Sequence, residues 1–234
     1  MLINADFSER AINLAADAQW RPSPAAGVER RMLDRIGDEV AVATSVVRYA
    51  PGSRFPTHTH TRGEEFLVLE GVFSDTAGDY GPGFYVRNPP GTSHAPWTDH
   101  GTTILVKLRQ FQATDRRRIA IDTSNGKWSP AANVGCTEQL LHSFEGEQVR
   151  MLHLDAGAQI PSRMIPGGEE IYVVSGAIED AAGVYPHDSW IRNAPGTAES
   201  YRATEAAVLW VKSGHLDTVD GPDRAATWEA LAEA

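Results

Sequence analysis

Four side chains that can bind a transition metal lie close together in the N-terminal half, among turn glycines and prolines. They are His58, His60, Glu64 and His94. Residues two apart in a strand point to the same face, so the first two imidazoles should project together. Imidazole and carboxylate donors without a thiolate suit Zn, Fe, Mn, Ni or Cu. Four such ligands close tetrahedrally around zinc, or leave two positions of an octahedral ion open for water, O₂ or substrate.

Turns and strand starts must bring these ligands together. The turn Thr61-Arg62-Gly63 precedes Glu64, which opens the next strand, so its carboxylate can return beside the imidazoles. His94 follows the turn Pro89-Pro90-Gly91 and arrives from a third strand. Glu65 is the alternative carboxylate if the first turn is longer, but strand alternation would place it on the opposite face. We therefore predict Glu64 as the ligand.

The rest of the hydrophobic pattern indicates an all-β protein, because short apolar runs alternate with Gly and Pro turns. The strands expected in the first half span 40–47, 65–70 and 102–108, and those in the second half span 149–154, 170–174 and 207–212. Short flanking helices are expected at 7–17 and 223–234, as packing elements.

The chain repeats itself at an offset of 105 residues. Segment 46–111 lies over 151–216 without a gap, with 18 identities in 66 positions, many of them at turns. Retained turn residues and register indicate two copies of one fold. We predict two domains, 1–116 and 117–234, joined near the polar, turn-rich segment 112–124. The basic residues 116–118 within it are interpreted as a solvated linker.

The second copy lacks the histidines. Arg163, Ile165 and Glu199 replace the three histidines at that offset, while Glu169 keeps the place of the ligand carboxylate. Arginine stays protonated and isoleucine has no donor atom, so we expect one divalent metal ion per chain, bound in the first domain. Three roles for Arg163 stay open: an ion pair inside the second barrel in place of the metal, a solvent-exposed side chain, or a binding site for an anion.

Composition excludes several function classes. The 234 residues carry a formal net charge of −10, which argues against a nucleic-acid-binding surface. No apolar run approaches the roughly 18 residues that span a bilayer, and the first residues do not resemble a signal peptide. Cys136 is the single cysteine, so no intrachain disulfide forms. We expect a cytoplasmic protein that binds neither membranes nor nucleic acid.

The spacings resemble the cupin superfamily of jelly-roll barrels. Its first motif, Gly-x5-His-x-His-x3/4-Glu-x6-Gly, is matched by Gly52, His58, His60, Glu64 and Gly71. Its second motif, Gly-x5-Pro-x-Gly-x2-His-x3-Asn, is matched by Gly83, Pro89, Gly91 and His94, with Thr98 in place of the terminal Asn. The resemblance implies two tandem cupin barrels, and it assigns the ligand role to the three histidines and Glu64.

Within the cupins, the phrases GEEFLVLEGVFSD and PPGTSHAPW resemble the cupin domain of ChrR-type anti-sigma factors. That resemblance implies a sensory, regulatory or small-molecule-binding protein holding Zn, Fe, Mn or Ni. Sigma-factor binding is not expected, because the family's helical zinc domain uses His and Cys ligands and the first 40 residues contain neither. Cupins commonly pair into dimers, and the two copies can satisfy that pairing within one chain; a homodimer of the chain stays open.

The alternative is a metal-dependent dioxygenase or isomerase acting on a small diketone or enediol, with O₂ or substrate at the metal. No catalytic acid or base can be assigned from the sequence. An open channel lined by four aromatic residues of the first half would favour the enzyme, whereas core packing of the same side chains would not. These residues are Phe66, Phe84, Tyr85 and Trp97.

Overall fold

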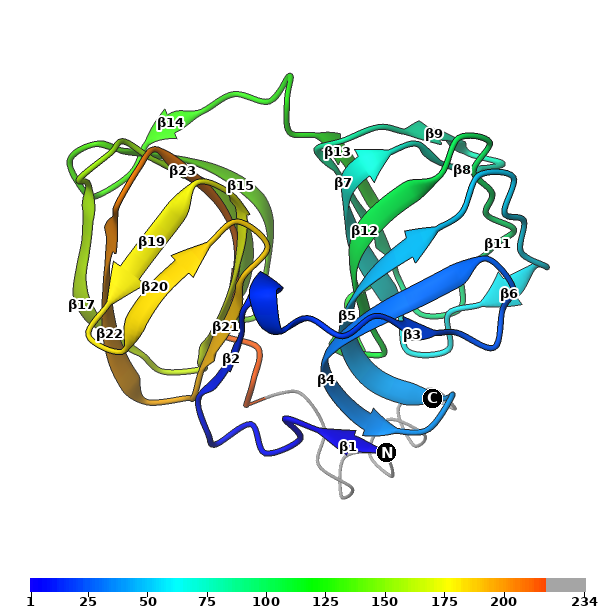
Figure 1. Cartoon of the computed structure of the whole chain (residues 1–234), viewed down its shortest axis with the longest axis horizontal. Helices are drawn as coiled ribbons and strands as arrows, with labels where there is room; N and C mark the ends of the chain where they lie inside the picture. The colour runs from blue at the N-terminus through cyan, green and yellow to red at the C-terminus, as the bar shows by residue number, and fades with distance from the viewer. Residues whose placement is uncertain (218–234) are drawn as a thin grey trace. The chain divides into compact units, whose positions relative to one another are not determined.

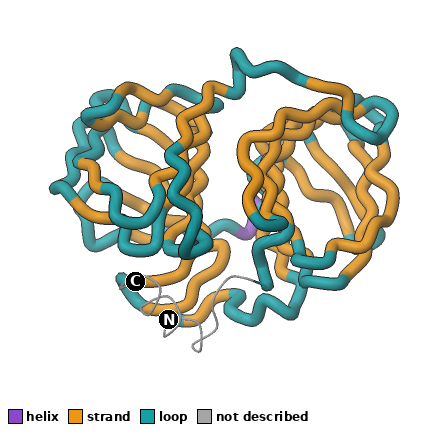
Figure 2. Tube along the Cα trace, turned by 180° about the vertical axis from the view of Figure 1, so that it is seen from behind, coloured by secondary structure: helices purple, strands orange, loops and turns teal. Residues whose placement is uncertain are grey.

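A computed structural model of the chain describes residues 1–217, and these residues are almost entirely β-structure (Figures 1 and 2). Contacts divide them into two compact units, one made of 1–5 with 19–125 and the other of 6–18 with 126–217. Each unit is an antiparallel β-barrel, as the sequence predicted, whereas the domain boundaries 1–116 and 117–234 stay a prediction. None of the described helices is long and apolar enough to cross a membrane.

The first unit is built on one large antiparallel sheet with the strand order β1-β4-β5-β12-β7-β10-β13, and β3 pairs with β4. Two short pairs, β11-β6 and β8-β9, accompany it. The strands are β1 (Leu2–Ile3), β3 (Arg21–Pro22), β4 (Val28–Gly37), β5 (Ala41–Tyr49), β6 (His58–Thr59), β7 (Glu64–Gly71), β8 (Phe73–Asp75), β9 (Gly78–Tyr80), β10 (Phe84–Asn88), β11 (Ser93–His94), β12 (Thr102–Leu108) and β13 (Ile119–Asp122).

The second unit repeats this arrangement, with the sheet β14-β15-β16-β23-β18-β21-β2 and a smaller sheet β17-β22-β19-β20. Its strands are β2 (Ala11–Asn13), β14 (Ser129–Pro130), β15 (Cys136–Phe144), β16 (Glu147–Leu154), β17 (Gln159–Ile165), β18 (Glu169–Ser175), β19 (Ala177–Asp180), β20 (Gly183–Pro186), β21 (Trp190–Asn193), β22 (Thr197–Ala203) and β23 (Ala207–Ser213).

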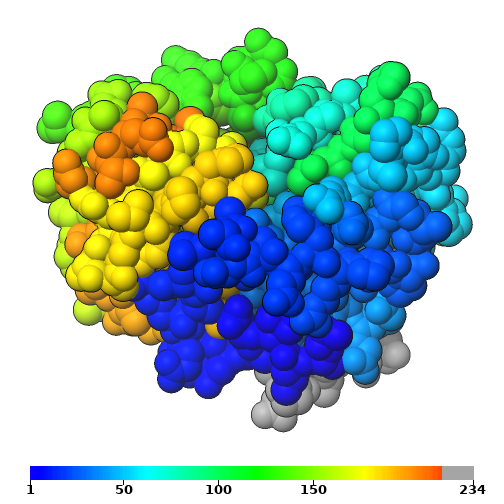
Figure 3. All heavy atoms as spheres, viewed as in Figure 1, coloured from blue at the N-terminus to red at the C-terminus, as the bar shows by residue number. Residues whose placement is uncertain are grey.

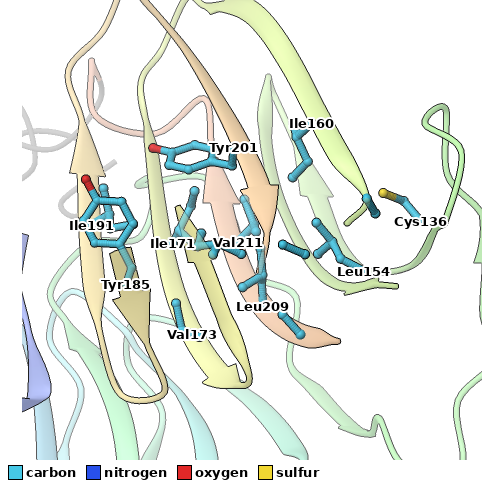
Figure 4. Close-up of a cluster of buried hydrophobic side chains, with 14 residues drawn as sticks. Cys136, Leu154, Ile160, Ile171, Val173, Tyr185, Ile191, Tyr201, Leu209 and Val211 are labelled. Carbon is cyan, nitrogen blue, oxygen red and sulfur yellow. The ribbon is translucent and has the colours of Figure 1, made fainter. Parts of the chain in front are cut away.

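Every strand expected from the sequence is present, and the offset of 105 residues holds in the register. Glu64 lies opposite Asn88 in the first unit, and Glu169 lies opposite Asn193 in the second. Alternating apolar residues of each sheet point inward and form the barrel core. Figure 4 shows the core of the second unit, in which Tyr201 and Tyr185 lie among aliphatic side chains such as Ile171.

The helix expected at 7–17 is wrong. This segment forms the strand β2, followed by the short 3₁₀ helix η1 (Ala15–Asp17). β2 pairs with the edge of β21, which supplies backbone partners that local helix propensity cannot outweigh. Ala11 is buried while Ile12 is 40% exposed, the alternation of a strand. The helix expected at 223–234 lies outside the described residues.

Two arms occupy equivalent positions in the two units. The N-terminal arm, residues 6–18, belongs to the second unit, where Ala11 lies opposite Arg192; its dark blue atoms lie beside the yellow strands of that unit in Figure 3. The segment 111–122 belongs to the first unit, where Ile119 lies opposite Arg87. The N-terminal arm therefore precedes the first barrel in sequence but completes the sheet of the second. The segment 111–122 precedes the second barrel but completes the sheet of the first.

Candidate metal centre

The four predicted ligands come from separate elements of the first barrel. His58 lies in β6, and His60 follows that strand by one residue. Glu64 begins β7, and His94 ends β11. Because β6 and β11 pair antiparallel with His94 opposite His58, the two histidine-bearing segments are fixed side by side.

Backbone hydrogen bonds hold the turn before β11 against His60. Gly91 N–H donates to the His60 carbonyl at 2.9 Å, and His60 N–H donates to the Thr92 carbonyl at 2.9 Å. Gly91 has φ of +87°, a conformation that glycine adopts without steric cost. The turn that contains this glycine therefore places His94 beside the other ligands.

The donor atoms converge on one point. His60 Nε2 lies 3.2 Å from His94 Nε2, and Glu64 Oε2 lies 3.3 Å and 3.5 Å from these two nitrogens. One donor atom of each of the four side chains, His58 included, lies within 4.8 Å of the others. Three of the residues are buried and His58 is exposed, so the cluster is reached from solvent on the His58 side.

The outer nitrogen of each imidazole already has a partner. His94 Nδ1 lies 3.0 Å from Asp75 Oδ2, and His58 Nδ1 lies 3.2 Å from the Pro56 carbonyl. His60 Nδ1 lies 3.1 Å from Thr92 Oγ1, whose own hydroxyl donates to a backbone carbonyl at 2.7 Å. All three partners accept, so each Nδ1 carries the proton and each Nε2 presents a lone pair to the cluster.

This donor set fits a metal cation. The Nε2 lone pairs of His60 and His94 face one another together with the Glu64 carboxylate, and these acceptors repel unless a cation or a proton lies between them. Metal–ligand bonds of about 2.1 Å put neighbouring donors about 3.0 Å apart at a right angle and about 3.4 Å apart at a tetrahedral angle. The separations of 3.2, 3.3 and 3.5 Å match that spacing.

Burial favours the neutral forms of these groups in the metal-free protein. Burial, together with the nearby His94 and His58, lowers the pKa of His60 to about 3. Burial also lowers the pKa of His94, against the opposing effect of the hydrogen bond that His94 donates to Asp75. The pKa of Glu64 rises to about 7 for the same reason. Neutral imidazoles are the form that binds metals.

The choice between the adjacent carboxylates follows from the pleat of β7. Glu64 points to the histidines and accepts a hydrogen bond from Asn88 Nδ2 at 3.2 Å. Glu65 points to the other face, where its Oε2 lies 2.6 Å from both Arg87 Nη1 and Tyr85 OH. Glu65 is therefore committed to a buried ion pair away from the cluster.

A cavity of about 450 Å³ adjoins the cluster. All four candidate ligands line it, together with a wall of apolar and aromatic side chains and a few polar ones. The apolar part includes Tyr49, Phe55, Phe73, Pro96 and Leu108, and the polar part includes Glu39, Thr59, Thr61 and Arg109. A volume of this size accommodates a small organic molecule beside a bound ion.

The four aromatic residues whose position was to distinguish an open channel from a packed core do not line this cavity. Phe66 is 1% exposed and packs in the barrel core, with Phe84 against the same core. Tyr85 lies on the Glu65 face of the sheet. Trp97 contacts Arg54, 5.9 Å from its ring centroid. These side chains therefore do not form the channel that would have favoured an enzyme, and Phe66 and Phe84 follow the alternative of core packing.

Sequence reasoning also missed Arg118, which it assigned to a solvated linker. Arg118 precedes β13 in the arm of the first unit, and its positive charge lowers the pKa of both His60 and His94. The register makes it the counterpart of Arg10, which precedes β2 in the arm of the second unit. The two arginines are not related by the offset of 105 residues, because each arm pairs with a barrel from a different place in the sequence. The repeat in the sequence therefore does not align them.

The second barrel forms an ion pair where the first has its cluster. Arg163 Nη2 contacts Glu169 Oε2, and the Arg163 side chain is 44% exposed while that of Glu169 is 1% exposed. Arg163 lies opposite Glu199 in the β17–β22 pair, as His58 lies opposite His94. The guanidinium thus offsets the charge of the retained carboxylate from the mouth of the barrel.

Several residues that support the first cluster persist in the second barrel. Thr197 donates to a backbone carbonyl at 2.8 Å, as Thr92 does at 2.7 Å. Asp180, the counterpart of Asp75, accepts instead from Arg10 Nη2, while Arg10 Nε donates to Asn193 Oδ1 at 3.1 Å. In the second barrel, Arg10 therefore binds the aspartate whose counterpart in the first barrel orients a histidine.

Two antiparallel barrels with this site define a cupin protein of the two-domain kind. A family model for the ChrR cupin-like domain matches the chain twice, over residues 8–112 and 116–217. The chain therefore belongs to the ChrR cupin-like family. No curated protein sequence matches it.

Similar solved structures include other cupins at low sequence identity. A putative dioxygenase from Nostoc punctiforme is 15% identical with a TM-score of 0.68, covering 94% of this chain and 84% of that chain. The bacterial pirin YhhW from Escherichia coli, in complex with nickel(II), is 13% identical with a TM-score of 0.65, covering 88% and 98%. A mutant of oxalate decarboxylase from Bacillus subtilis is 11% identical with a TM-score of 0.60, covering 87% and 77%. These likenesses establish the fold.

Proposed function

We propose that the first barrel binds one divalent transition metal ion through His58, His60, Glu64 and His94, and that the adjoining cavity receives a small molecule that chelates this metal. The observation that carries the proposal is the convergence of three acceptor atoms at 3.2 to 3.5 Å, with the outer nitrogen of every histidine bonded elsewhere. Nickel, iron, manganese and zinc all accept this donor set.

The residues around the site have two roles, to orient the ligands and to form an apolar wall. Asp75, Thr92 and the Pro56 carbonyl orient the imidazoles, so that each Nε2 is available as a ligand. Tyr49 and Phe55 lie edge to face with ring centroids 5.2 Å apart and form part of a wall that limits water at the site. A bound metal supplies Lewis acidity toward a chelating ligand.

The second barrel serves as a support that does not bind a transition metal. Arginine and isoleucine at positions 163 and 165 offer no ligand atom, and Glu169 is already paired. This asymmetry supports a regulatory or small-molecule-binding protein with one functional site per chain.

The test uses cobalt(II) as a spectroscopic probe. Protein purified without a His-tag, stripped and reloaded with cobalt, should change its visible absorption when acetylacetone is added, because the diketone enters the coordination sphere. The His60→Ala variant should take up little cobalt and give no change. If the visible spectrum of the cobalt-loaded wild-type protein does not change with acetylacetone or other small chelators, the ligand-binding part of the proposal is contradicted.

A metal-dependent dioxygenase or isomerase is the second candidate function. The cavity favours it, since an apolar wall beside an open metal site suits a small diketone or enediol, and the fold is shared with a putative dioxygenase. Iron(II)-loaded protein should then consume O₂ in the presence of acetylacetone, at a rate lost in His60→Ala. Binding of the diketone without O₂ consumption would favour the sensory or binding role.

A further inference from the structure

Arg109 lines the cavity of the candidate metal centre, one residue after β12 ends. Its φ is +62°, a left-handed conformation that residues other than glycine rarely adopt. Its Nη1 donates to Thr61 Oγ1 at 2.5 Å, and Thr61 lines the same cavity. A long side chain is thus kept in an unfavourable backbone conformation beside the cluster, the kind of position at which function offsets strain.

The second barrel provides an internal comparison. The counterpart of Arg109 at the offset of 105 residues is Gly214, with φ of +75°. Both residues make the same backbone hydrogen bond: Arg109 N–H donates to the Gly63 carbonyl, and Gly214 N–H to the Gly168 carbonyl, each at 2.9 Å. The loop therefore folds with glycine, which suits this φ better, and an arginine stands only in the copy that has the histidines.

The partner of Arg109 changes together with it. Thr61 corresponds to Pro166, which has no hydroxyl to accept the guanidinium hydrogen bond. The ligand positions 58, 60 and 94 differ between the copies as well. The arginine, its threonine partner and the metal-binding histidines are thus all present in one barrel and all absent from the other.

The charge of Arg109 is not neutralised by the protein. Within residues 1–217 its guanidinium forms no ion pair, and Glu39, the acidic residue on the cavity wall besides Glu64, bonds instead to Arg30 at 3.4 and 3.5 Å. Arg109 is half-buried, and this burial lowers the pKa of its guanidinium. A partly desolvated guanidinium facing a cavity is a strong binding group for a carboxylate.

We propose that Arg109 binds a carboxylate of the small molecule that occupies this cavity, so that the ligand of the first barrel is an anionic metal chelator. This inference rests on the proposed function and names the ligand class. A divalent metal with the Glu64 and Asp75 carboxylates and the Arg118 guanidinium leaves one net positive charge, and Arg109 adds a second. The local field therefore attracts an anion although the chain as a whole carries −10.

The experiment compares two hydroxypyrones with the same chelating pair of oxygens. Comenic acid carries a carboxylate where kojic acid carries a hydroxymethyl group. Binding of each to nickel-loaded protein is measured by titration calorimetry in the wild type, Arg109→Gly and Arg109→Lys. Arg109→Gly installs the residue that the second barrel uses and should fold normally. Arg54→Gly, an exposed arginine outside the cavity, is the matched control.

We expect Arg109→Gly to weaken comenate binding about tenfold, the size of a charge-assisted hydrogen bond, while kojic acid binding changes far less. Arg109→Lys should restore part of the preference for comenate, and Arg54→Gly should keep all of it.

An unchanged ratio of the two affinities in Arg109→Gly, or an equal loss for both chelators, overturns the inference. Nickel content and kojic acid binding retained in that case would leave the proposed function standing. Failure of the wild type to hold nickel, or to bind either chelator, overturns both.

Discussion

Asp75 Oδ2 accepts a hydrogen bond from His94 Nδ1 at 3.0 Å, while the other carboxylate oxygen of Asp75 accepts from Ala77 N–H at 2.7 Å. The aspartate thus fixes the orientation and the tautomer of one candidate ligand from inside the barrel, where its side chain is 1% exposed. A carboxylate behind a histidine also raises the basicity of the ligand nitrogen.

Asp75→Asn should therefore weaken metal binding about 10- to 100-fold, the usual effect of losing such a partner. Competition with a fluorescent chelator measures the affinity. Asp180→Asn is the matched control, since its carboxylate binds Arg10 in the second barrel. It should leave the metal affinity unchanged. Equal losses in the two variants would mean that the aspartate acts only on general stability.

The neighbouring carboxylates Glu64 and Glu65 should respond in opposite ways. Glu64→Gln removes an anionic donor and should abolish tight metal binding while the melting temperature of the metal-free protein falls little. Glu65→Gln should keep the metal but lower stability by about 3 kcal/mol, because it breaks a buried pair with Arg87. Metal titration and thermal unfolding of both variants separate the effects. A metal-binding defect in Glu65→Gln alone would reverse the assignment.

The second barrel should regain a metal site when its histidines are restored. The triple variant Arg163→His, Ile165→His and Glu199→His recreates the donor set around Glu169. Thr197 already makes the hydrogen bond that Thr92 makes in the first barrel. The variant is expected to bind two metal ions per chain, and the second more tightly once Arg10→Gln frees Asp180. Calorimetric titration with nickel counts the sites; a single site in the quadruple variant would contradict the equivalence of the two barrels.

Much of the site could be predicted because it depends on local periodicity. The two-residue step from His58 to His60 and the turn before Glu64 determine which side chains share a face. Turn glycines fix where the next strand begins, and so the four side chains come together as expected. Their role as metal ligands stays a prediction until a metal is measured.

The features that escaped prediction depend on contacts distant in sequence. The arm at 6–18 has a weak helical pattern, yet it pairs with β21 almost 180 residues away, and such pairing outweighs local propensity. Arg118 reaches the cluster only because its arm pairs with β10. Arg109 gave no signal, since a positive φ at a residue other than glycine cannot be read from residue types.

The most direct test of the central claim is the metal content per chain, by mass spectrometry of protein purified without a His-tag. His58→Ala and Arg163→Ala are a matched pair, because the two residues occupy equivalent positions and neither side chain is buried. We expect about one transition metal ion per chain in the wild type and in Arg163→Ala, with most of it lost in His58→Ala. Two ions per chain, no ion in the wild type, or full retention in His58→Ala would contradict it.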